Sequence, residues 1–130
     1  MLGGPSREDM LALAKQAVRN LPPHFREQAR DVVVRVRDFA TREQLDAVDI
    51  ADRWHLSGLY EGHPITEQSV WASGDLPPKV TLFRQPLLAE MRETGVGLEE
   101  LVRHVVIHEL GHHFGFSDED MHALEDEVDD

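Results

Sequence analysis

The sequence contains no cysteine among its 130 residues. A disulfide framework and thiolate zinc ligands are therefore excluded, so any metal site must use His, Asp or Glu side chains. No stretch approaches the roughly 20 apolar residues that cross a bilayer, and the first residues lack the order of a secretion signal. We therefore expect a cytoplasmic protein that has no membrane partner.

Positive charge is scarce, with 13 Lys and Arg against 25 Asp and Glu and a formal net charge of −12. Such a chain repels phosphate backbones, so nucleic acid is not an expected partner. Apolar residues make up 41% of the sequence, which is enough for one hydrophobic core in a chain of this length. We therefore expect a single domain over residues 1–130, while the composition favours no particular oligomeric state.

Hydrophobic periodicity divides the chain into helices and strands. Apolar residues at helical spacing, with their caps and stops, predict helices at 6–20, 24–28, 41–49, 86–94 and 98–114. Alternating or β-branched stretches predict strands at 31–39, 56–60, 64–66 and 80–84. The fold class that follows is α+β, with a small mixed sheet packed on an N-terminal helix and on the long helix 98–114.

The long helix ends in the stretch HELGHHFGFSD, residues 108–118. His108 and His112 are four residues apart, which places both rings on one helix face about 6 Å apart along the axis, within reach of one ion. Glu109 lies about 100° further round the helix, beside such an ion. In that position its carboxylate can hold a water molecule and accept its proton, so we assign it the role of general base.

A catalytic zinc takes three protein ligands and leaves one position open. Gly115 can end the helix in a left-handed conformation, and the reversed chain then brings Asp118 back towards His108 and His112. We therefore predict one Zn²⁺ per chain, bound by His108, His112 and Asp118. In the alternative reading Asp118 caps a following helix, and the third ligand is Glu119, Asp120 or His122.

The pattern HExxHxxGxxD resembles the extended zinc motif of the metzincin metalloproteases, in the variant that has Asp as third ligand. Together with GLYEG (58–62) and VTLFR (80–84), the segment 108–118 resembles a family of small bacterial minimal zincin-like metallopeptidases. The resemblance implies a zincin-like fold, with the metal between a sheet and the active-site helix and an edge strand that pairs with an extended substrate. We take 80–84 as that edge strand. Metzincins place a Met in a turn beneath the zinc, and Met121 is either its counterpart or a core residue of a terminal helix.

The function expected from these residues is a zinc-dependent endopeptidase that acts on peptide or protein substrates. A first alternative is hydrolysis of another substrate such as RNA, because a bacterial ribosomal-RNA endonuclease family shares the His spacing but lacks the Glu. A second is a non-catalytic zinc module, in which His113 or His122 closes the fourth position. We expect His104 to lie too far along the helix to bind the same ion, and Tyr60 to be a buried, hydrogen-bonded residue.

Overall fold

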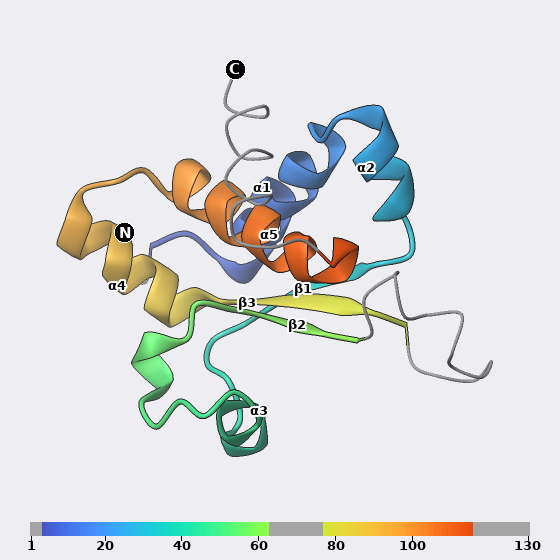
Figure 1. The fold of residues 1–130 in the computed structure, drawn as a ribbon. Coiled ribbons are helices and arrows are strands. Elements are labelled where there is room, and N and C mark those ends of the chain that lie inside the picture. The colour runs from blue at the N-terminus through green and yellow to red at the C-terminus, as the bar shows by residue number, and fades with distance from the viewer. Residues whose placement is uncertain (1–3, 63–76, 116–130) are drawn as a thin grey trace.

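A computed structural model describes residues 4–62 and 77–115 of the chain. Within them the elements follow in the order α1 (Arg7–Arg19), α2 (Pro23–Gln28), β1 (Val33–Arg37), α3 (Arg42–Ala47), the 3₁₀ turn η1 (Arg53–His55), β2 (Gly58–Glu61), β3 (Lys79–Phe83), α4 (Arg84–Thr94) and α5 (Leu98–Phe114). Figure 1 shows α1 and α5 together over one face of the sheet and α3 below the other face. The predicted α+β class, with the sheet packed on the first and last of these helices, is confirmed.

Local sequence features explain where α1 begins and where α5 ends. Ser6 caps α1 reciprocally: its hydroxyl accepts the Asp9 N–H, and the Asp9 carboxylate accepts the Ser6 N–H, each at 3.0 Å. Helix α5 ends at Gly115, whose φ of 77° is the left-handed conformation that glycine adopts without strain. Helix α5 therefore ends at Gly115, as the sequence predicts.

The sheet is mixed, and its strand order is β1-β3-β2. Strand β3 pairs in parallel with β1 and antiparallel with β2, so both of its edges are hydrogen-bonded. The expectation that 80–84 forms the edge strand is therefore wrong. Val80, Leu82 and Phe83 are fully buried, and a strand covered on both faces with a partner on each side is typically such a continuous apolar run. Among the described residues, β2 has only β3 as a neighbour and takes one of the two edge positions, with β1 at the other.

The two faces of the sheet differ in chemistry. Towards α1 and α5 the strands contribute Val36, Val80 and Leu82 to the main hydrophobic core. On the opposite face, a smaller apolar cluster joins Leu45 of α3 to the strands and the segment before β2; its buried members are Ala40, Leu45, Leu56, Leu59 and Phe83. Leu45 therefore packs α3 against the lower face of the sheet, close to the start of β2.

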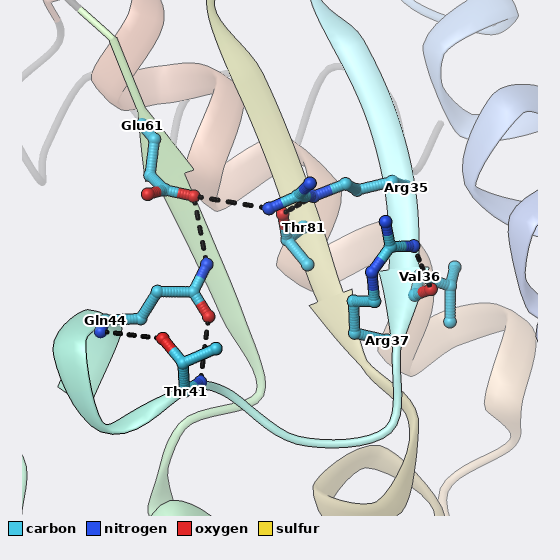
Figure 2. A network of polar contacts seen from close by, with 7 residues as sticks. All are labelled: Arg35, Val36, Arg37, Thr41, Gln44, Glu61 and Thr81. Carbon is cyan, nitrogen blue, oxygen red and sulfur yellow. Dashed lines mark hydrogen bonds and ion pairs between the residues drawn. The ribbon is translucent and has the colours of Figure 1, made fainter.

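Polar contacts on the same lower face connect β1, β2, β3 and α3 (Figure 2). The Arg35 guanidinium donates to the buried Thr81 hydroxyl at 2.8 Å and lies 3.8 Å from Glu61. Glu61 also accepts the Gln44 side-chain amide at 3.1 Å, while Gln44 completes a capping box with Thr41 at the start of α3. These contacts link α3 to the end of strand β2.

Several predictions fall outside the described residues. These are the strand at 64–66 and the roles of Asp118, Met121 and His122. The single domain over residues 1–130 stays a prediction. In the described ranges 4–62 and 77–115, no helix has the length and apolar character that crossing a membrane requires.

Candidate metal centre

The last two turns of α5 gather the predicted site residues. His108, Glu109 and His112 each offer one ligand atom, and these atoms all lie within 4.8 Å of one another. The rings of His108 and His112 are 5.3 Å apart between centroids and nearly perpendicular. His104 stacks on His108 at 6.3 Å one turn earlier, is exposed, and does not belong to the group, as expected.

The donors of this group fit zinc. Imidazole nitrogens and carboxylate oxygens are its ordinary ligands, at about 2.0–2.2 Å from the ion, so two donors of one tetrahedral ion lie about 3.3–3.6 Å apart. The ligand atoms here lie within 4.8 Å of one another, so side-chain rotation is needed to bring two of them to one ion. The His112 side chain is half exposed and has room for such a rotation.

Glu109 is the buried member of the group, with 13% of its side chain exposed. Burial raises the pKa of its carboxyl from 4.5 to about 7, while a backbone hydrogen bond from Tyr60 acts in the opposite direction. One Glu109 oxygen lies 4.0 Å from His112 Nε2. A carboxyl with a pKa near neutrality is suited both to accept and to return a proton.

Gly58 allows the edge strand to lie directly against the motif helix. A Cβ at this position would overlap Val105 Cγ1 and would lie 3.4 Å from Glu109 Cγ. Only glycine therefore lets β2 approach α5 this closely, in the way glycine serves wherever backbone must approach another element. The approach places the β2 backbone beside Glu109.

His113 holds the same two elements together from the other side of the helix. It is 2% exposed, and its Nε2 lies 3.1 Å from the Gln28 carbonyl oxygen, which can only accept a hydrogen bond. Nε2 therefore carries the proton, and Nδ1 accepts the Tyr60 hydroxyl at 2.9 Å. Burial lowers the pKa of His113 and so favours this neutral form. The expectation that Tyr60 is hydrogen-bonded is confirmed, and His113 has no nitrogen left to bind a metal.

The edge of β2 that faces away from β3 borders the site. Phe83 donates to the Ser57 carbonyl at 2.9 Å, and because hydrogen-bonded pairs alternate in an antiparallel ladder, Leu59 and Glu61 also face β3. The backbone groups of Gly58 and Tyr60 therefore point away from the sheet. They border a hollow of about 410 Å³ that Glu109 and His112 line on the side of α5.

On its far side the hollow is lined by Val48, Leu56 and Leu59. The sequence analysis assigned no role to Val48, and it did not find the close approach that Gly58 allows. A glycine in the middle of the predicted strand 56–60 was the one feature of the sequence that indicated such a contact. No sequence pattern around Val48 indicates a role in the site, because only the position of α3 beneath the sheet brings it to the hollow.

Comparison with known proteins agrees with this arrangement. No curated protein matches the chain significantly. A family model described as zincin-like metallopeptidase matches residues 29–128, which include every strand of the sheet and the whole of α5. The match covers well over half of the sequence, and its HExxH-type motif is the cluster of His108, Glu109 and His112. The chain therefore belongs to the zincin-like metallopeptidase family.

Proposed function

We propose that this protein is a zinc-dependent endopeptidase, with His108, His112 and Asp118 as the metal ligands and Glu109 as the general base. The observation that carries the proposal is the group of His108, Glu109 and His112, whose ligand atoms lie within 4.8 Å of one another and two of whose members line the hollow beside β2. A bound zinc would act as a Lewis acid and lower the pKa of water towards about 7. We propose that each chain binds one Zn²⁺. The proposed substrate is a peptide or protein.

In the proposed reaction, Glu109 first accepts a proton and then donates it. Its carboxylate accepts a proton from the attacking water as the new C–O bond forms at the scissile carbonyl carbon. The protonated carboxyl afterwards donates that proton to the amine nitrogen as the C–N bond breaks. In the metal-free protein, burial raises the pKa of this carboxyl and so favours its uptake of a proton.

Strand β2 supplies the means of orienting the substrate. Its outward-facing backbone groups at Gly58 and Tyr60 can pair with an extended peptide, as in β-augmentation. A peptide bound there passes over the hollow that Glu109 and His112 line. The Tyr60 N–H is hydrogen-bonded to Glu109 in this structure, so a peptide competes with Glu109 for that one donor.

The test combines zinc content with turnover. Elemental analysis of protein purified without added metal should give near one zinc per chain for wild type and a sharp fall in His108→Ala and in Asp118→Ala. Glu109→Gln should keep the zinc and lose cleavage of a peptide library by roughly 100-fold or more, the usual contribution of a general base. His104→Ala is the matched control, because it removes an exposed imidazole of the same helix outside the group. Peptide cleavage that persists in Glu109→Gln would refute the assignment.

A further inference from the structure

We infer that the hollow beside Glu109 selects substrates with an apolar side chain, and that Val48 is the residue that determines this preference. The inference rests on the proposed peptidase function and adds to it the class of residue recognised. It comes from the composition of the hollow, which is polar on the side of α5 and apolar on the side of α3.

The apolar side consists of Val48, Leu56 and Leu59, which we call the α3 wall. Leu56 and Leu59 are each 8% exposed because they belong to the small cluster around Leu45. Val48, in contrast, is 38% exposed. Its side chain is therefore the part of the α3 wall that a ligand can still cover.

The backbone holds Val48 firmly in this place. Asp49 follows it with a φ of 57°, a left-handed conformation that Asp tolerates better than most residues. This reversal lets the Ile50 N–H bond the Leu45 carbonyl at 3.0 Å and closes α3 directly after Val48. The hydrogen bond from Gln44 to Glu61 connects the same helix to the end of β2 (Figure 2). The α3 wall is thus prearranged with respect to the edge strand.

Strand geometry brings one substrate side chain to the wall. Side chains alternate between the two faces of a sheet, and residues directly opposite in neighbouring strands share a face. Gly58 and Tyr60 face α5, whereas Leu59 faces the lower side with Phe83 and Leu45. A peptide paired with β2 therefore directs the side chain opposite Leu59 towards the α3 wall, and its neighbours on either side towards α5.

The chemistry of that position favours Leu, Met or Phe over Gly and over acidic residues. An apolar side chain covers Val48 and excludes water from the wall, while a carboxylate would lose its hydration against Val48, Leu56 and Leu59. The volume of about 410 Å³ falls in the range of roughly 300–1,000 Å³ that is usual for ligand pockets. The hollow therefore has room for a side chain together with part of its backbone.

The experiment measures binding separately from cleavage. Zinc-loaded Glu109→Gln is titrated with acetyl-Ala-X-Ala-amide peptides, where X is Gly, Leu, Phe or Asp, and the methyl resonances of Val48, Leu56 and Leu59 are followed by NMR. We expect Leu and Phe to bind about 10-fold more tightly than Gly, since burial of such a side chain is worth at least that factor. Their addition should shift the Val48 methyl signals, and Asp should bind no better than Gly.

Variants at matched exposed valines then test the residue itself. Val48→Glu should abolish the preference for Leu over Gly, and the milder Val48→Thr should reduce it. Val33→Glu is the control, because Val33 is 45% exposed on β1 and does not line the hollow. It should leave the preference intact. Equal binding of all four peptides to the Glu109→Gln protein, or an unchanged preference in Val48→Glu, overturns the inference.

Cleavage of the same peptides by the wild-type protein separates the two proposals. Apolar-selective binding without any cleavage supports the α3 wall and refutes the peptidase function. Cleavage with equal efficiency for every X, together with equal binding, refutes the wall and leaves the peptidase function standing.

Discussion

Replacement of Glu109 by Gln should stabilise the metal-free protein, and the gain should grow with pH. Burial raises the pKa of this carboxyl from 4.5 to about 7, so the folded state disfavours its charged form. The stability that the neutral carboxyl contributes is fully present below pH 4.5 and is lost as the pH rises through 7. Gln is neutral at every pH and can still accept the Tyr60 N–H.

The size of the effect follows from that pKa. Each pKa unit is worth about 1.36 kcal/mol, so charging Glu109 costs the folded protein about 3 kcal/mol at pH 8. The carboxyl is 13% exposed, so solvent screens little of this cost. For a chain of 130 residues the gain corresponds to a melting temperature roughly 10 °C higher for Glu109→Gln. At pH 4.5 and below the two proteins should melt together.

Thermal unfolding followed by circular dichroism, with a chelator present and over pH 4 to 8, measures this difference. The pKa of His113 is also lower in the folded state, but its effect on stability is the same in both proteins and cancels in the comparison. Glu93→Gln, which removes one exposed carboxylate from α4, is the control for the change in net charge. Equal melting temperatures at pH 8, or a difference that is largest in acid, would contradict the desolvation of Glu109.

Two further predictions concern the packing of β2 on α5. Gly58→Ala should lower the free energy of unfolding by about 1–3 kcal/mol through overlap with Val105, and Val105→Ala in the same chain should restore part of it. Urea denaturation measures both, and additive losses in the double variant would show that the two residues do not meet. Tyr60→Phe should cost about 1–3 kcal/mol because it leaves the buried His113 Nδ1 without its donor. His113→Ala should cost more, since it also leaves the Gln28 carbonyl unpaired, and the reverse order in urea denaturation would refute the assigned hydrogen-bond chain.

Local rules account for most of the elements. The capping boxes at Ser6 and Thr41 and the left-handed glycines at Gly95 and Gly115 set helix ends within a residue or two of those predicted. The spacing of His108 and His112 is enough to place both rings on one face, because helix geometry repeats over a single turn. Strand β2 lies about two residues later than predicted, and such boundary shifts are common for short strands.

The sequence by itself therefore determined the HExxH group and the helix that presents it, since both depend on neighbours along the chain. The tertiary structure alone decided which strand borders the site. An apolar run such as 80–84 does not indicate whether the strand has a neighbouring strand on one side or on both. Pairing with β1 and β2 makes β3 the central strand. The bond between Tyr60 and His113, and the place of Val48 opposite Glu109, likewise join residues more than 50 positions apart. Such contacts arise only when the sheet and helices pack, because no periodicity encodes them.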